Sequence, residues 1–383
     1  PDFTPPDIND RLSSVYWLNK RTVIPGKYSI EPFSPRDRIL RWRDLENQKM
    51  EELRIDYQTS GAAIASFTVG PDNAIYGSTC HPMELWRFTP ATNSGAQLGH
   101  VKAIGGGNIT KVVRWKDQLI GNSYSKGVIY SFSPEKPFQD GGSTPNPRPV
   151  GNTSPHIQRP RSLQIHQDGK HLVSGGFPGY GMRGGGLAIY DLEEGQLKTT
   201  LPHEKLIPNH AITAIADTPG GNLILGTSVT TPGGATPTEK EAVIAKFLWE
   251  KQEVEWSTVP VPGARQISGL ISLSGTRVAG VTAEGVFFVF DLGTKKTVHQ
   301  QNLNAGTPAT QRGDTAFVRL GESKALLLMG NAIFCVEGSE GKIRKIATAP
   351  SKIHSGGCIL DGRLYFSSGP NLWSYEIHKA IAR

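Results

Sequence analysis

The hydrophobic and polar positions of this chain repeat one pattern seven times. An apolar run ends in small residues, a polar loop follows, and a second run rich in aromatic residues comes after the loop. Short runs of this kind, bounded by Gly, Pro, Asn and Asp, predict β-strands. The paired runs are 73–78 and 85–88, 118–122 and 128–132, 171–176 and 187–191, 222–227 and 243–247, 277–281 and 286–291, 325–330 and 332–336, and 363–368 and 372–375.

The spacing of the repeat indicates its architecture. The small residues that close the first runs lie 38 to 54 residues apart. A further apolar run and a tight polar turn precede each pair, so each unit reads as an antiparallel meander. Periods of about 40–50 residues are typical of β-propellers. We therefore predict an all-β fold, a seven-bladed β-propeller of four-stranded antiparallel blades. The closing residues are Gly77, Gly121, Gly175, Gly226, Gly280, Gly330 and Ser368.

The last unit leaves no room for a fourth strand, and this sets the expected domain boundaries. A candidate strand, Glu52–Tyr57, precedes the first unit, and its pairing with Leu372–Tyr375 would close the ring. Closure removes exposed strand edges. We expect the propeller to span 51–377, with an N-terminal extension over 1–50 and a C-terminal tail over 378–383.

The N-terminal extension holds many aromatic residues for a free segment. Trp17, Tyr28, Phe33 and Trp42 favour packing of this extension along the side of the propeller or across one mouth. A disordered leader is the alternative.

Composition and charge narrow the classes of partner. Gly and Pro, at 44 and 27 residues, make nearly a fifth of the 383 positions, and 37% hydrophobic residues still permit a core. No apolar stretch reaches the ~18 residues of a membrane span, so we expect no membrane contact. The net charge of +7 includes no run of five Lys or Arg, which argues against nucleic acid and suits an anionic small partner.

The cysteines and sequons bear on the compartment. Cys80, Cys335 and Cys358 are too few for a disulfide framework; pairing of the last two stays open, although apolar strand contexts favour buried thiols. Sequons at Asn108 and Asn152 permit secretion. No signal peptide is visible, and a start without Met indicates a processed or trimmed chain. We expect a secreted or extracellular monomer.

One rim of the expected propeller gathers cationic residues. In a blade, the loop between the second and third strands and the link into the next blade lie on the same face. These segments carry four histidines and five arginines, whereas Asp72, Asp117, Asp168 and Asp361 fall on the opposite turns. A cationic funnel focuses anions, and Arg matches carboxylate oxygens. The expected substrate-binding residues are Asn108, Arg159, Arg161, Arg183, Arg265, Arg312 and His354. The few acids assigned to this rim are Glu239, Glu241, Glu284 and Asp314.

Other kinds of site lack their sequence signatures. The chain has no phosphate loop, no zinc-spaced Cys pair and no nucleophile elbow, and the rim offers no evident pair of carboxylates. A metal site made of His81, His210 and His354 stays open as an alternative. We expect neither a metal nor a cofactor.

What remains is chemistry run by His, Tyr and Arg on an anionic substrate, and β-elimination on a uronic acid fits these residues. An Arg or a protonated His offsets the negative charge of the sugar carboxylate. A neutral His or a Tyr then removes the proton from the carbon next to that carboxylate. A His or Tyr then protonates the leaving oxygen. His81 begins a rim loop after a strand of small residues, and Tyr124 lies in the equivalent loop of the next unit. We predict His81 as the proton-transfer residue, with Tyr124, Tyr180 or His210 as its partner.

Two units carry a resemblance to a known group of proteins. AIYGSTCHPMELWRFTP and HLVSGGFPGYGMRGGGLAIYDLEEG resemble blades of secreted propellers that process uronic-acid glycans, including polysaccharide lyases and enzymes acting on rhamnose–glucuronate caps of arabinogalactan. The resemblance covers 51–377. It implies a catalytic His in the central funnel, which His81 matches, and an anionic oligo- or polysaccharide as partner. A non-catalytic ligand-binding or protein-interaction propeller is the alternative, and a metal or quinone oxidoreductase is the third hypothesis.

Overall fold

The all-β prediction is confirmed by a computed structural model of the chain. It describes residues 22–24, 27–31, 38–56, 61–102, 107–273, 275–310 and 312–377. Within these ranges, 31 strands form eight antiparallel sheets of three or four strands. The chain divides into two compact units, Pro1–Gly61 and Ala62–Arg383.

The described strands of the first unit form one sheet of their own. Its order is β1 (Thr22–Ile24), β2 (Tyr28–Ile30), β3 (Ile39–Asp44) and β4 (Met50–Arg54). Tyr28 and Trp42 lie in this sheet, whereas Trp17 and Phe33 fall outside the described residues.

The strand expected to close the repeat is used inside this first sheet, so that prediction is wrong. Glu52 lies opposite Arg41 in the β3–β4 ladder, and their side chains form an ion pair at 3.1 Å. The turn between the strands is held locally, because Asp44 Oδ1 accepts from the backbone N–H of Glu46 at 2.8 Å. Closing so short a loop costs far less chain entropy than pairing residues more than 300 positions apart.

The described part of the second unit contains seven sheets, named here sheets 1 to 7, each made of strands that follow one another along the chain. It also contains two short 3₁₀ helices, η1 and η2. Sheets 1 to 4 are β5 (Ala63–Val69), β6 (Ile75–Cys80), β7 (Glu84–Thr89) and β8 (Ser94–His100); β9 (Asn108–Trp115), β10 (Gln118–Tyr124), β11 (Val128–Phe132) and β12 (Arg148–Asn152); β13 (Arg159–Ile165), β14 (His171–Phe177), β15 (Gly186–Asp191) and β16 (Gln196–Pro202); and β17 (Ala211–Asp217), β18 (Leu223–Ser228), β19 (Ile244–Leu248) and β20 (Glu253–Thr258). Sheets 5 to 7 are β21 (Ile267–Ser272), β22 (Arg277–Thr282), β23 (Val286–Asp291) and β24 (Lys296–Asn302); β25 (Phe317–Gly321), β26 (Lys324–Met329), β27 (Ala332–Glu337) and β28 (Lys342–Thr348); and β29 (Ile359–Leu360), β30 (Arg363–Ser368) and β31 (Asn371–Glu376). The helices are η1 (Pro90–Thr92) and η2 (His203–Lys205).

Burial changes from the second strand of a sheet to the fourth. Every residue of β18 is buried, whereas exposed and half-buried residues alternate along β20. A continuous apolar run suits a strand covered on both faces, and alternation suits one with a solvated face. The fourth strands therefore form the solvent-exposed edges of the four-stranded sheets.

Neighbouring sheets pack face to face through apolar side chains. Phe287 and Val289 of sheet 5 share a core with Leu327 and Phe334 of sheet 6. Sheets 3 and 4 lie so close together that Gly175, one of the small residues that close the first runs, cannot carry a side chain. A Cβ added at Gly175 would lie 2.7 Å from the Ile212 side chain of sheet 4.

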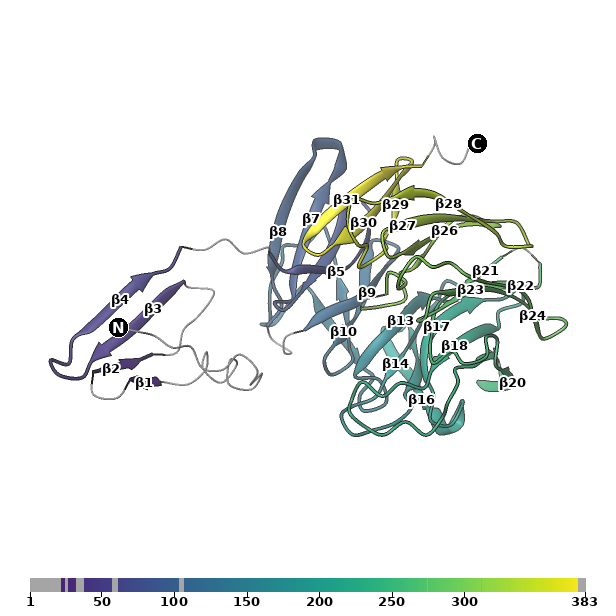
Figure 1. The fold of residues 1–383 in the computed structure, drawn as a ribbon, viewed down its shortest axis with the longest axis horizontal. Helices are drawn as coiled ribbons and strands as arrows, with labels where there is room; N and C mark the ends of the chain where they lie inside the picture. Colours follow the sequence, from purple (N-terminus) through teal and green to yellow (C-terminus); the bar gives the residue numbers. More distant parts are fainter. Residues whose placement is uncertain are drawn as a thin grey trace. The chain divides into compact units, whose positions relative to one another are not determined.

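The last sheet contacts the first. The Ile64 N–H donates to the Gly369 carbonyl at 2.9 Å, and Ser355 Oγ donates to the Ala65 carbonyl at 2.8 Å. Phe67 shares a core with Tyr365. Figure 1 shows the yellow strands β30 and β31 beside β5 of the first sheet. This arrangement is compatible with a propeller-like fold.

The contact between the last and first sheets predicts the effect of a substitution at Gly357. A Cβ there would lie 2.0 Å from the Phe67 ring, so Gly357→Val should lower the free energy of unfolding by about 1–3 kcal/mol through overpacking. Gly321→Val is the control, because a Cβ there meets no atom within 4 Å. Urea denaturation measures both variants, and an equal loss in the two would contradict the packing described.

Candidate functional site

The end of β10 and the loops that follow β6 and β14 bring several of the expected site residues together. Tyr124 Oη lies 3.5 Å from Tyr180 Oη, and the His81 ring meets the Tyr124 ring edge-on at 6.4 Å. The Arg159 guanidinium lies 4.1 Å from the centre of the Tyr180 ring and 5.7 Å from that of Tyr124. We call His81, Tyr124, Tyr180, Arg159, Arg161 and Arg312 the cationic–aromatic cluster.

Local structure fixes Arg159 and Arg161 at the start of β13. Arg159 pairs with Phe177 at the end of β14 and donates from its guanidinium to the Pro178 carbonyl at 3.0 Å. Arg161 donates to the backbone carbonyl of Arg312 at 2.7 Å and lies over the Phe177 ring. The two guanidinium groups are thus held by backbone and aromatic contacts.

Like charges concentrate at this cluster. Burial, together with the neighbouring guanidinium groups of Arg312 and Arg159, lowers the pKa of Arg161 to about 10. An anion placed among these groups would relieve their mutual repulsion.

The two tyrosines of the cluster are electrostatically unequal. The hydrogen bond with Tyr124, helped by the Arg159 cation, lowers the pKa of Tyr180. The same hydrogen bond, with burial, raises the pKa of Tyr124. Tyr180 is also 74% exposed and Tyr124 is half-buried, so Tyr180 is the more accessible of the two.

Cys80 and Asn108 are buried residues next to the cluster. Cys80 Sγ lies 2.9 Å from His81 Nδ1 and 3.6 Å from Asn108 Oδ1. Burial raises the pKa of the Cys80 thiol, and nearby Arg312 opposes the shift. Asn108 is buried and donates to Thr110 Oγ1 at 3.3 Å. Its side chain is therefore fixed within β9, next to the Cys80 thiol.

The structure describes the other four expected residues in other surroundings. His210 places Nδ1 2.8 Å from the Pro208 carbonyl and Nε2 3.2 Å from that of Glu241. His354 accepts from the Gly369 N–H at 2.9 Å, and burial and Lys352 lower its pKa. Arg183 donates to the Thr236 carbonyl at 2.8 Å, and Arg265 is exposed.

The segment before β25 runs against the first strands of sheets 2 and 3. A Cβ added at Gly313 would lie 2.8 Å from the Thr110 carbonyl and 3.0 Å from that of Arg161, so only glycine fits this approach. The Asp314 N–H donates to the Arg161 carbonyl at 2.8 Å. We call 312–315 the crossing segment, because it joins sheet 6 to strands of sheets 2 and 3.

Asp314 was expected on the cationic rim, and the structure places its carboxylate elsewhere. It forms an ion pair with Lys111 of β9 and lines a cavity of about 950 Å³. Burial raises the pKa of Asp314 to about 6, although Lys111 opposes this shift. The crossing segment thus contributes Arg312 to the cationic–aromatic cluster and Asp314 to a separate cavity.

This cavity contains functional candidates that the sequence analysis missed. Asp217 ends β17 and lines it, and burial raises the pKa of its carboxyl. Gln164 donates to Asp217 Oδ1 at 2.9 Å, and Arg319 lines the same space. The signal available in the sequence was an acid at the end of an otherwise apolar first strand.

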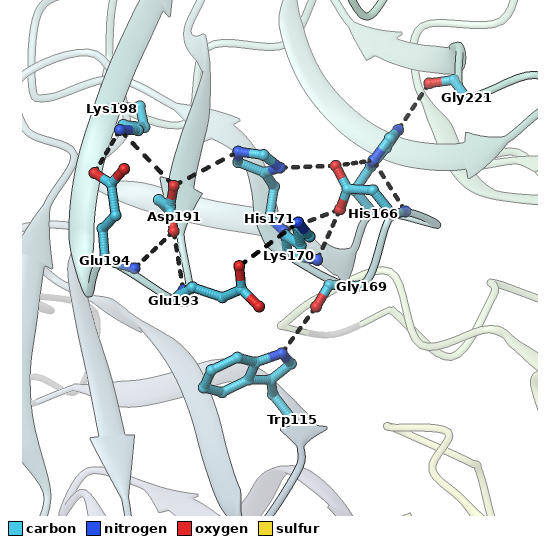
Figure 2. A network of polar contacts seen from close by, with 11 residues as sticks. Trp115, His166, Gly169, Lys170, His171, Asp191, Glu193, Glu194, Lys198 and Gly221 are labelled. Carbon is cyan, nitrogen blue, oxygen red and sulfur yellow. Dashed lines mark hydrogen bonds and ion pairs between the residues drawn. The ribbon is translucent and has the colours of Figure 1, made fainter.

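A second polar network lies at the turn between β13 and β14 (Figure 2). Asp168 Oδ2 lies 2.9 Å from His166 Nδ1 and 2.7 Å from His171 Nδ1. The His166 ring stacks on Trp249 at 3.8 Å. Trp115 donates to the Gly169 carbonyl at 2.9 Å. Because Trp115 belongs to sheet 2 and Trp249 follows β19 of sheet 4, the network ties three sheets together.

Metal ligands, thiols and membrane-spanning helices can be assessed within the described ranges of the chain. These ranges hold no group of three or more His, Cys, Asp or Glu side chains placed to bind a metal ion. All three cysteines are free and buried, which confirms the expectation of buried thiols. None of the helices described there is long and apolar enough to traverse a bilayer.

Comparison with known protein families finds no match for this chain, and comparison with curated proteins finds none either.

The Lys111–Asp314 pair predicts a pH-dependent loss of stability. Lys111→Met leaves a buried carboxylate without its cation, so we expect about 3–5 kcal/mol less stability at neutral pH. The loss should shrink as the pH falls toward about 6, because removal of Lys111 raises the pKa of Asp314 above that value and the carboxyl takes up a proton. Denaturant unfolding at neutral and mildly acidic pH measures it. A loss of equal size at both pH values would contradict the ion pair's role.

The Asp168 network predicts acid sensitivity. Although burial opposes it, hydrogen bonds from the Lys170 backbone N–H and from His171 and His166 hold the pKa of Asp168 at about 2. The resulting stabilisation is complete above about pH 4 and is lost as the pH falls from 4 to 2. Asp168→Asn should therefore cost about 1 kcal/mol at neutral pH, after allowance for solvent screening. Melting temperatures across this pH range provide the measurement, with Asp117→Asn on the equivalent turn of sheet 2 as control. A constant difference down to the lowest pH would argue against the network.

Proposed function

We propose that sheets 1 to 7 form a closed seven-bladed β-propeller whose last blade has three strands. The support is the contact of sheet 7 with sheet 1 through Ile64, Ala65 and Phe67. A sheet of three or four strands cannot bury both faces alone, so a ring of such sheets completes their cores.

We further propose that the protein is a lyase that acts on a glycan containing uronic acid, with the cationic–aromatic cluster as its site. The observation that carries the proposal is the gathering of Arg159, Arg161 and Arg312 beside two hydrogen-bonded tyrosines. Guanidinium groups bind carboxylates through paired hydrogen bonds, and a bound carboxylate would offset the repulsion among them.

The proposed reaction is β-elimination. The arginines hold the sugar carboxylate and stabilise the negative charge that forms as the proton on the adjacent carbon is removed. The electron pair of that C–H bond forms a carbon–carbon double bond, and the bond from the next carbon to the glycosidic oxygen breaks. The leaving oxygen takes up a proton, so the products are an unsaturated uronate and a shortened sugar chain. The step needs no oxidant or reductant.

Tyr180 is the proposed base and His81 the second proton-transfer group. The lowered pKa of Tyr180 makes its phenolate more accessible near neutral pH, and Tyr124 and Arg159 stabilise that anion. His81 is exposed and packs against Tyr124, within the same cluster. His210 is left out, because both its ring nitrogens face backbone carbonyls.

A non-catalytic binding module is the second candidate function. Tyr180 and Met182, at 74% and 38% exposure, lie on one loop beside the cluster. Exposed aromatic and Met side chains are common at protein–protein contacts. A secreted, monomeric protein fits either candidate, and the exposed Asn152 is the more accessible of its two sequons.

Activity with uronic polysaccharides tests the lyase proposal. The protein is incubated with pectate, alginate, hyaluronan and glucuronate-capped arabinogalactan while the absorbance of unsaturated uronate is followed. On the substrate that is cleaved, Tyr180→Phe should lower kcat by about 10²–10⁴-fold, because the base is lost. Arg159→Ala should raise KM by about ten- to a hundred-fold.

Tyr375→Phe, on the last strand, is the matched control and should keep full activity. Reducing ends without unsaturated product would contradict elimination. Binding of an acidic glycan without cleavage would favour the binding module instead. Full activity of Tyr180→Phe would remove this tyrosine from the mechanism.

A further inference from the structure

The cavity of about 950 Å³ has no part in the proposed lyase reaction. Its lining includes Gln167, Thr218, Gly275 and Glu322, which belong to the turns between first and second strands of four sheets. In the cationic–aromatic cluster, Tyr124 ends a second strand and Arg159 begins a first strand. His81 and Tyr180 lie on the adjoining loops between second and third strands. In an antiparallel meander these two sets of connections lie at opposite ends of the sheets. The cavity therefore opens at the end away from that cluster, and its size is within the range of ligand pockets.

Hydrogen-bonding groups of both kinds line this cavity. Gln164, Lys111 and Arg319 supply donors, while Asp217 and Asp314 supply acceptors. Several are held in place: Gln164 donates to Asp217 at 2.9 Å, and Arg319 donates to the Ser272 carbonyl at 2.8 Å. Donors and acceptors that are already held in place favour ligands with matching hydrogen-bond geometry, and they lose little conformational entropy on binding.

The charges of the lining nearly cancel. Lys111 is paired with Asp314, and Asp217 lies close enough to Arg319 for each to affect the other's titration. Glu322 adds one exposed carboxylate. Burial already penalises the charge on Asp217 and Asp314, so a further anion would be repelled. A small cation would have to compete with Lys111 and Arg319 for these carboxylates.

Apolar surface lies beside the polar groups. Phe317 and Leu270 line the cavity, and Phe317 is half-buried. Sugars present hydroxyls that both donate and accept, and C–H faces that pack on aromatic and aliphatic side chains. Neither a simple ion nor a purely apolar ligand uses this combination.

We propose that this cavity is a second ligand site, which binds a neutral mono- or oligosaccharide through Asp217, Gln164 and Arg319. It is independent of the lyase reaction, since none of these side chains belongs to the cationic–aromatic cluster. The ligand can be a neutral branch or end of the uronic-acid glycan or a separate neutral sugar, because each presents the same hydroxyl groups to the cavity.

Titration calorimetry of the full chain tests the site with cellobiose, xylobiose, maltotriose and galactobiose. Digalacturonate and spermidine serve as charged comparators. Asp217→Asn should weaken binding of the neutral sugar tenfold or more, because its amide group cannot accept as the carboxylate does. Gly321→Trp should abolish it, since Gly321 lines the cavity and has open space for a side chain.

Asp117→Asn is the matched control, because this exposed acid lies on the equivalent turn of sheet 2 and is not among the lining residues of the cavity. Tyr180→Phe separates the two proposals, since it should leave neutral-sugar binding unchanged. Circular dichroism confirms that each variant is folded. Tighter binding of digalacturonate or spermidine than of every neutral sugar would overturn the proposal. So would neutral-sugar binding that survives Gly321→Trp, or no binding of any neutral sugar in the panel.

Discussion

The structure depends on the packing of each small sheet against its neighbours. A sheet of four strands such as β21–β24 has two apolar faces, and Phe287 and Phe288 fill cores on opposite sides of it. The same dependence explains why apolar residues of sheet 7 pack against Phe67 of sheet 1. Stability is thus shared along the series of sheets, and the loops at their ends are left to carry chemistry.

The crossing segment divides that chemistry into two regions. Gly313 allows the backbone to lie against β9 and β13. Of its neighbours, Arg312 belongs to the cationic–aromatic cluster and Asp314 lines the cavity. One region concentrates guanidinium groups beside tyrosines, and the other balances Lys111 and Arg319 against carboxylates. The net charge of +7 is modest, but the positive charge is concentrated at the cationic–aromatic cluster and is balanced by carboxylates at the cavity.

Sequence reasoning predicted the parts that depend on local pattern. The paired runs correspond to the second and third strands of the seven sheets. The end of β10 and the loops after β6 and β14 place His81, Tyr124 and Tyr180 together. It assigned Glu52 to the wrong sheet, because a local hairpin with β3 outcompetes a distant partner. It missed the Asp217 cavity and the place of Asp314, since no local pattern shows that Gly313 meets strands some 150 and 200 residues away.

The central claim is that the cationic–aromatic cluster binds a sugar carboxylate. A crystal structure of the Tyr180→Phe protein with a uronate oligosaccharide tests it most directly. The account predicts the carboxylate among Arg159, Arg161 and Arg312, with the adjacent C–H directed toward the position of the Tyr180 hydroxyl. A uronate bound only in the cavity beside Asp217, or no uronate bound at the cluster, would contradict it.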